Sequence, residues 1–127
     1  MTRILVVEDS TDILFLLQTE LEWLNYSVQV ASDALTGLEL ARKSRPEVIV
    51  SDLHMPGIDG HEFIRRVRRI PELARIPAIA LTGYSLDAEL KLALAAGFDA
   101  HLTKPVDGKT VSDTIARLLT KRMKKAS

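Results

Sequence analysis

Short apolar runs alternate with amphipathic runs along the whole chain. These runs are too short for a helix core, and the run that ends at Val50 is rich in β-branched side chains, which predicts buried β-strands. The five strands are expected at Ile4–Val7, Val28–Ala31, Val48–Ser51, Ala78–Leu81 and Ala100–Thr103. After each of these runs, apolar residues recur three or four positions apart, which is the spacing of an amphipathic helix.

These apolar stripes predict five helices. The stripes are Leu14, Leu17, Leu21 and Leu24; Ala34, Leu38 and Ala41; Phe63, Ile64 and Val67; Leu90 and Leu94; and Val111, Ile115, Leu118 and Leu119. The polar segment Ser10–Asp12 has the composition of a helix start, and Asp107 is placed to cap the last helix. Strand and helix therefore alternate from one end of the chain to the other.

Five repeats of strand then helix predict a single α/β domain whose parallel sheet is covered on both faces. Each crossover should be right-handed. The strands are short and no glycine-rich turn follows the first one, which argues against a dinucleotide-binding fold. The expected architecture is flavodoxin-like and doubly wound, with strand order 2-1-3-4-5 and ligands at the carboxyl ends of the strands. We expect the domain over residues 1–122 and a tail over residues 123–127.

Composition argues against several classes of function. Seventeen Lys and Arg residues balance seventeen Asp and Glu residues, and a net charge of zero argues against nucleic acid or an anionic membrane as the main partner. The chain has no cysteine, so thiol catalysis, disulfides and cysteine-bound zinc are excluded. The N-terminus has no signal-peptide pattern, and no apolar stretch is long enough to span a bilayer. The simplest location is the cytoplasm.

Carboxylates follow two of the predicted strands. Glu8 and Asp9 come after the first strand and Asp52 after the third. A charge at such a place is costly unless it is paired, bound to a metal or used chemically. Because parallel strands end at the same edge, we expect the three acids to form one negative pocket, whose oxygen ligands suit Mg²⁺ or Mn²⁺ rather than zinc. The alternative is that they are helix caps and turn acids, with Asp9 capping the first helix.

Two further polar residues lie at the ends of other predicted strands. Thr82 ends the fourth and Lys104 the fifth. Beside three acids, a hydroxyl donor and an ammonium group fit a site that holds an anion for part of the time. The alternatives are an ordinary β-residue for Thr82 and an ordinary salt bridge for Lys104. Gly83 leaves space for an incoming group or permits a turn. The Lys104–Pro105 peptide is a candidate for the cis form, although trans is the default.

With these motifs in this order, essentially the whole chain resembles a response-regulator receiver domain. The motifs are Glu8-Asp9, Asp52 in SDLHMPGIDG, Thr82 in LTG and Lys104 in TKP. The resemblance implies a phosphoryl-accepting switch of a two-component phosphorelay, in which Asp52 takes phosphate from a sensor histidine kinase or a histidine phosphotransfer protein and signals to a downstream protein target. It also implies a regulatory domain rather than an enzyme, without direct contact to nucleic acid or membrane, and a monomer or weak dimer.

The resemblance further implies a metal site and a set of phosphoryl contacts. The metal ligands would be Asp9, Asp52, the backbone carbonyl of His54 and, mostly through water, Glu8. Thr82 would bind the new phosphoryl oxygen and move inward, while Lys104 would pair with the phosphoryl group. The surface formed by the fourth helix, fifth strand and fifth helix would then change. The family also has a cis bond before the proline that matches Pro105.

One position departs from the family pattern. The family usually has Tyr or Phe three residues before the lysine, as a rotameric switch, and this chain has His101 there. His101 is either a switch residue or a half-exposed histidine at the end of a strand. His54 lies where the family varies, and its side chain either tunes access of water to the phosphoaspartate or faces solvent. His61 is expected on a helix surface.

Two other functions compete with this reading. A Mg²⁺-dependent aspartyl-phosphate phosphatase of the haloacid-dehalogenase kind also has a nucleophilic Asp after a parallel strand, but it needs a second acid where His54 stands. A flavodoxin-like cofactor binder needs a hydroxyl-rich loop, for which Ser10 and Thr11 are a thin match, and aromatic residues, which make up only 5% of the chain.

The arginines within Arg65–Arg69 fit a solvated helix face. The chain is either a stand-alone receiver or one excised from a larger kinase or regulator.

Overall fold

Five parallel strands form one sheet in the computed structural model, which describes residues 1–84 and 86–126. The strands are β1 (Arg3–Val7), β2 (Ser27–Ala31), β3 (Val48–Asp52), β4 (Ala78–Thr82) and β5 (Ala100–Thr103). Their order across the sheet is β2-β1-β3-β4-β5, so the predicted flavodoxin-like topology is confirmed. All neighbouring pairs run parallel, which brings the carboxyl ends of the strands to one edge.

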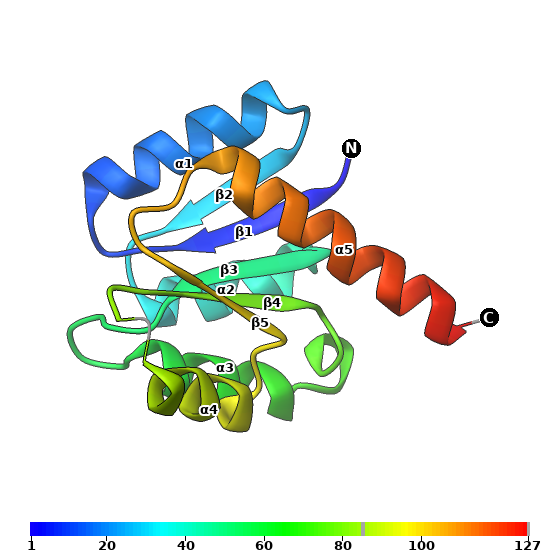
Figure 1. Cartoon of the computed structure of the whole chain (residues 1–127). Helices are drawn as coiled ribbons and strands as arrows, with labels where there is room; N and C mark the ends of the chain where they lie inside the picture. The colour runs from blue at the N-terminus through cyan, green and yellow to red at the C-terminus, as the bar shows by residue number, and fades with distance from the viewer. Residues whose placement is uncertain (85, 127) are drawn as a thin grey trace.

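Helices cover both faces of the sheet (Figure 1). They are α1 (Thr11–Trp23), α2 (Ala34–Ser44), α3 (Gly60–Arg69), α4 (Asp87–Ala96) and α5 (Gly108–Ala126), with a short 3₁₀ turn, η1, at Pro71–Leu73. α1 and α5 lie on one face, and α2, α3 and α4 lie on the other. α5 runs through the boundary expected at residue 122. Among the described residues, no helix combines the length and hydropathy that a membrane crossing requires.

The sheet separates two apolar cores. Phe63 and Ile64 of α3 lie in the core under α2, α3 and α4, while Leu17 of α1 lies in the core under α1 and α5. β3 and β4 are buried along their whole length because layers cover them on both faces, which explains their continuous apolar sequences.

Both β3 and β4 extend one residue beyond the predicted ends. Asp52 and Thr82 are therefore buried strand residues, held in place by the backbone ladder.

The fourth helix packs differently from its predicted stripe. Its buried residues are Ala93 and Ala96, whereas Leu94 is 46% exposed and Leu90 is only half-buried. The prediction that leucines form the inner face of this helix is therefore wrong. Ala93 and Ala96 belong to the same core as Phe63, and their small side chains let the α4 backbone lie close to that core.

Glycine is required where α3 begins beside β3. A Cβ atom at Gly60 would clash with the carbonyl oxygen of Asp52 and would come within 2.7 Å of the Leu53 Cα. The Gly60 N–H donates to the Leu53 carbonyl at 3.0 Å. Asp59 caps the helix, because its Oδ1 accepts from the Glu62 N–H at 2.9 Å. The start of α3 therefore lies directly against the strand end that carries Asp52.

One arginine of α3 is a structural residue. The Arg68 side chain is only 20% exposed. Its guanidinium donates to the Gly97 carbonyl at 3.0 and 2.8 Å, to the Ile76 carbonyl at 2.6 Å and to Asp99 Oδ2 at 3.1 Å. Weaker contacts reach η1 and the residue after it. The expectation of a solvated face is therefore wrong for Arg68, which joins α3 to the segments that enter β4 and β5.

Candidate functional site

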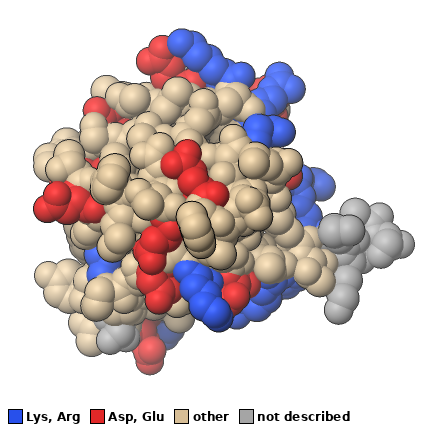
Figure 2. All heavy atoms as spheres, turned by 90° about the horizontal axis from the view of Figure 1, so that it is seen from above, with Lys and Arg blue, Asp and Glu red and all other residues tan. Residues whose placement is uncertain are grey.

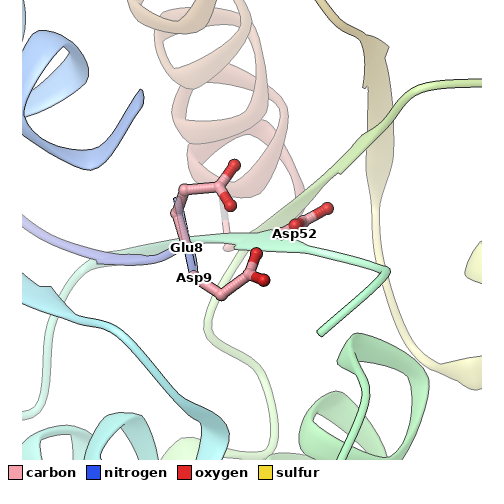
Figure 3. A group of neighbouring side chains, drawn as sticks. All are labelled: Glu8, Asp9 and Asp52. Carbon is pink, nitrogen blue, oxygen red and sulfur yellow. The ribbon is translucent and has the colours of Figure 1, made fainter. Parts of the chain in front are cut away.

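Three acids meet at the carboxyl edge of the sheet. Asp52 ends β3, while Glu8 and Asp9 directly follow β1, and the Glu8 N–H continues the ladder by donating to the Ala31 carbonyl at 3.0 Å. One carboxylate oxygen from each acid lies within 4.8 Å of the others. Figure 3 shows Glu8 and Asp9 extending from the end of β1 toward the side on which Asp52 lies. Oxygen donors gathered in this way are the kind that a hard cation such as Mg²⁺ takes.

A lysine lies inside this acidic cluster. Lys104 follows β5, and its backbone N–H donates to the Thr82 carbonyl at 2.7 Å, which sets its position relative to β4. Its Nζ is 2.6 Å from Glu8 Oε1 and 3.2 Å from Asp52 Oδ2. The peptide bond between Lys104 and Pro105 is cis. Four of the predicted site residues, from three different strand ends, thus share one pocket.

Burial dominates the electrostatics of Glu8. The side chain is fully buried, and this burial raises the pKa of Glu8 to about 7, against the lowering effects of Lys104 and of the Ser10 backbone N–H. Repulsion from Asp52 is a smaller contribution. Burial would lower the pKa of Lys104, but its contacts with Glu8 and Asp52 raise that pKa above its ordinary value. The pocket therefore has more negative groups than its one lysine can compensate.

The carboxylate of Asp9 has no capping role. Ser10 is the N-cap of α1, and its hydroxyl accepts from the Ile13 N–H at 3.4 Å. Asp9 is exposed, and it forms no side-chain hydrogen bond or ion pair with any other described residue. The alternative in which Asp9 caps the first helix is therefore wrong. Its carboxylate is available to a ligand.

The hydroxyl of Thr82 faces the loop that follows β4. Thr82 is fully buried, and its Oγ1 accepts a hydrogen bond from the Tyr84 N–H at 3.1 Å. Because the hydroxyl acts as an acceptor toward Tyr84, its own hydrogen remains available for donation to an anion. A Cβ atom at Gly83 would have no neighbour within 4 Å among the described residues, so this glycine leaves open space beside Thr82.

His54 contacts Asp52 and two residues that no sequence motif marks. Its backbone N–H donates to Asp52 Oδ1 at 3.3 Å, and its Nε2 lies 3.2 Å from Glu89 Oε1. The rings of His54 and Tyr84 meet edge to face, with their centroids 5.6 Å apart. The His54 side chain is 50% exposed, so it lies at the surface but does not simply point into solvent. Tyr84 follows β4 and Glu89 lies in the first turn of α4, so both contacts come from segments distant along the chain.

The other two histidines each have a buried ring nitrogen. His101 is half-buried on β5, where it pairs in register with Ala80, and its Nε2 has no hydrogen-bond partner among the described residues. A switch role for His101 stays a prediction. The His61 side chain is only 15% exposed, and its Nε2 is likewise buried without a partner in the described part of the chain. The expectation that His61 lies on a helix surface is therefore wrong.

A family model identifies the class to which this fold and site belong. The model of the response regulator receiver domain matches residues 4–116. The chain therefore belongs to the response-regulator receiver family, as its motifs predict. Domains of this family are regulatory, and they act as phosphorylation-based switches that accept phosphate from histidine kinases in two-component signalling.

Similar proteins include both single receivers and larger regulators. Protein PilH of Pseudomonas aeruginosa is 34% identical over 94% of this chain and 98% of its own length. The chemotaxis protein CheY4 of Vibrio cholerae has a TM-score of 0.88 and 32% identity, covering 92% of this chain and 98% of that one. The receiver domain of the P. aeruginosa sensor histidine kinase PA1611, which has a magnesium ion coordinated in its active site cleft, has a TM-score of 0.84 and 28% identity over 91% of this chain and 95% of its own. The chain spans about half the length of several transcriptional regulators that it matches.

Proposed function

We propose that the chain is a phosphoryl-accepting switch with Asp52 as the acceptor. The observation that carries the proposal is the 3.2 Å contact between Lys104 Nζ and the Asp52 carboxylate inside a cluster of three acids. A buried carboxylate beside a flexible cation is suited to gain a charged group, because the lysine can follow the new charge. The division into a receiver domain over residues 1–122 and a tail over residues 123–127 is part of this proposal.

Mg²⁺ is the cation that we assign to the acidic pocket. Its ligands would be Asp9, Asp52, the backbone carbonyl of His54 and, mostly through water, Glu8. Three observations support the fit: the carboxylate oxygens lie within 4.8 Å of one another, Glu8 is buried with a raised pKa, and Asp9 has no partner among the described residues. Mn²⁺ suits the same donors. The bound cation supplies neutralisation of charge during phosphoryl transfer, and the magnesium in the PA1611 receiver domain supports the assignment.

The roles of the protein side chains follow from their positions. A carboxylate oxygen of Asp52 attacks the phosphorus of a phosphohistidine, the new O–P bond forms as the P–N bond breaks, and the departing imidazole takes up a proton. Lys104 moves from Glu8 onto the phosphoryl oxygens, where a charge of about −1.5 to −2 appears. Thr82 donates its hydroxyl hydrogen to another phosphoryl oxygen. Positioning and charge stabilisation then supply the catalysis.

The response is expected on the face formed by α4, β5 and α5. An inward move of Thr82 pulls on the loop that begins at Gly83, and His101 has a buried ring nitrogen that can take a new hydrogen bond. A differential interaction on the order of a few kcal/mol is enough to shift a two-state equilibrium. The proposed phosphate donor is a sensor histidine kinase or a histidine phosphotransfer protein. The proposed target is a downstream protein, contacted by a monomer or weak dimer without direct nucleic acid or membrane binding.

Labelling with acetyl phosphate and Mg²⁺, read by intact mass, tests the acceptor. We expect one phosphoryl group on the wild-type chain and none on Asp52→Asn, because the substitution removes the attacking oxygen. Asp87→Asn, an exposed acid in the first turn of α4, is the matched control and should label like the wild type. Labelling that survives in Asp52→Asn would show that another residue is the acceptor. Partner capture with and without beryllofluoride, which mimics the phosphoryl group, then identifies the target.

A phosphatase is the less favoured alternative. His54 occupies the position where that chemistry needs an acid, and its ring pairs with Glu89. Multiple turnover of a phosphate ester by the wild type, lost in Asp52→Asn, would favour the phosphatase over the switch.

A further inference from the structure

The opposite edge of the sheet has a concave surface of positive charge. A hollow of about 650 Å³ lies where the chain enters β4 and β5, beside the later turns of α5. Arg68, Arg75, Lys121 and Arg122 line it, and Asp99 is the carboxylate in its lining. Figure 2 shows Lys and Arg side chains along the right-hand edge of the molecule, on the side where α5 ends. A volume of this size is typical of small-molecule sites.

The wall of this hollow is preformed by Arg68, which is not itself free to bind. Its guanidinium holds the carbonyls of Gly97 and Ile76 and one oxygen of Asp99, and the same Asp99 oxygen accepts from the Ala78 N–H at 2.9 Å. At Gly97, where φ is +133°, a Cβ atom would come within 2.9 Å of the Arg68 Cγ, so a larger residue would displace the arginine. The negative charge of Asp99, the acid in the lining, is therefore already neutralised by Arg68.

Three cations at the rim remain without compensation. Arg75, Lys121 and Arg122 are exposed, and none of them forms an ion pair within the part of the chain that the structure describes. Arg122 also lies close enough to Arg68 to repel it. Burial is the main cause that lowers the pKa of Arg68, and the charge of Arg122 adds to the effect. A concave surface that concentrates like charges in this way attracts anions.

We propose that this hollow binds an organic phosphate of nucleotide size that carries at least two phosphate groups. The guanidinium groups of Arg75 and Arg122 offer bidentate contacts to phosphate oxygens, and Lys121 adds a point charge. Pro77 and Leu118 supply apolar surface for the flat part of the ligand. A single inorganic phosphate would fill only a small part of the hollow.

The arrangement of acids favours a small ligand over a nucleic acid chain. A long polyanion is usually bound by a continuous basic stripe. Here a second hollow adjoins the first through Arg122, and its lining includes Glu47 and Glu72. These acids interrupt the positive surface next to Arg122. The ligand is therefore expected to stay within the first hollow.

Equilibrium binding of a fluorescent ATP analogue to the whole chain tests the proposal. EDTA is present throughout, so that the acidic edge cannot bind the phosphates through a metal. We expect saturable binding that ATP and ADP displace, that AMP displaces at least about tenfold less well, and that adenosine does not displace. Arg75→Glu and Arg122→Glu should each weaken binding by about tenfold or more, because each removes a charge-assisted contact. Arg42→Glu is the matched control, since Arg42 is exposed on α2 and does not line the hollow.

Several results would overturn the proposal. One is the absence of saturable binding up to millimolar analogue. Another is equal weakening by Arg42→Glu, which would indicate a general charge effect. Displacement by single-stranded DNA but not by ATP would mean that the surface binds a polymer. Thermal melting of each variant separates lost binding from lost folding. Arg75→Lys should lose less affinity than Arg75→Glu, because it keeps the charge but not the bidentate contact.

Discussion

Each edge of the sheet has a largely buried cation, but one of them can exchange its partners and the other has a structural role. At the carboxyl edge, Lys104 contacts the carboxylates of Glu8 and Asp52. At the amino edge, Arg68 donates to several main-chain carbonyls and to Asp99. A lysine is a compact charge on a flexible stem, whereas the planar guanidinium of an arginine is fixed by the groups that surround it. One cation is therefore available for exchange, and the other holds elements together.

The parallel topology explains why the two edges differ in charge. Every helix starts at the carboxyl edge and ends at the opposite edge, so the partial positive charges of the helix N-termini and the partial negative charges of the C-termini are separated. Acids occur in the first turns of α1, α3 and α4, and basic residues occur in the last turns of α2 and α3. A net charge of zero thus conceals a molecule with an acidic edge and a basic edge.

The largest effect is expected from Arg68→Ala, which removes the structural cation of the amino edge. The substitution leaves the carbonyls of Gly97 and Ile76 without their donor and Asp99 without its cation. We expect the free energy of unfolding to fall by about 3–5 kcal/mol in urea titrations. Arg68→Lys should recover only part of the loss, because it has fewer donors. The exposed neighbour Arg69→Ala is the control, with a change within about 0.5 kcal/mol; equal losses in Arg68→Ala and Arg69→Ala would contradict a structural role.

Lys104→Met tests whether the cation at the carboxyl edge takes part in phosphoryl transfer. The substitution removes the partner of the phosphoryl group, so the rate of labelling by acetyl phosphate with Mg²⁺ should fall by about 100-fold. The loss of stability should be smaller than in Arg68→Ala, because Glu8 can take up a proton when the lysine is absent. Lys109→Met, on the exposed side of α5, should label at the wild-type rate. If the two variants label equally fast, Lys104 is only an ordinary ion-pair partner.

Addition of Mg²⁺ should stabilise the chain through the acidic edge alone. A cation that binds the folded site and not the unfolded chain raises the free energy of unfolding by about 2.7 kcal/mol at 100 times its dissociation constant. Thermal melting across a millimolar titration measures the effect. Asp9→Asn should reduce it, whereas Asp12→Asn, an exposed acid in the first turn of α1, should not. A melting temperature that does not respond to Mg²⁺ would count against the metal site.

A pH dependence of the stability is also expected from Glu8. Its pKa is about 7 in the folded chain against an ordinary 4.5, so the folded state binds the proton more tightly. The stability that this group contributes is complete below about pH 4.5 and is lost as the pH rises through about 7. In EDTA, the free energy of unfolding of the wild type should therefore decline relative to Glu8→Gln between about pH 5 and 8. Urea titrations that give parallel curves for the two proteins would show that the Glu8 proton is not linked to folding.

The strands and the acidic site were predictable because their signals are local. β3 and β4 are buried on both faces, so each begins with a run of apolar residues, and the polar residues at their ends are conspicuous. Since parallel strands end at one edge, the direction of the chain alone is enough to expect Asp52 and Lys104 close together. Asp107 does cap α5, because its Oδ1 accepts from the Thr110 N–H at 2.8 Å.

Other features depend on which elements pack together, and no local signal marks them. Arg68 stands among other arginines in the sequence, and only the approach of the Gly97 turn, 29 residues away along the chain, distinguishes it. The inner face of α4 is formed by Ala93 and Ala96, and only the packing of the helix on its core distinguishes them from the neighbouring leucines. The contact between His54 and Glu89 likewise joins the β3–α3 loop to the first turn of α4, which is distant along the chain.

The amino-acid sequence was enough to predict the alternation of strands and helices and the topology that follows from it. It also predicted the four charged residues at the carboxyl edge, which are Glu8, Asp9, Asp52 and Lys104. Hydrophobic periodicity and chain direction suffice for those, because both are properties of single elements. Packing between distant elements determines which cations are held by fixed partners and which can bind a ligand, because the groups that surround a charged side chain are assembled only on folding. The fixed guanidinium of Arg68, the exchangeable ammonium of Lys104 and the uncompensated rim of Arg75 and Arg122 all follow from packing between distant parts of the chain.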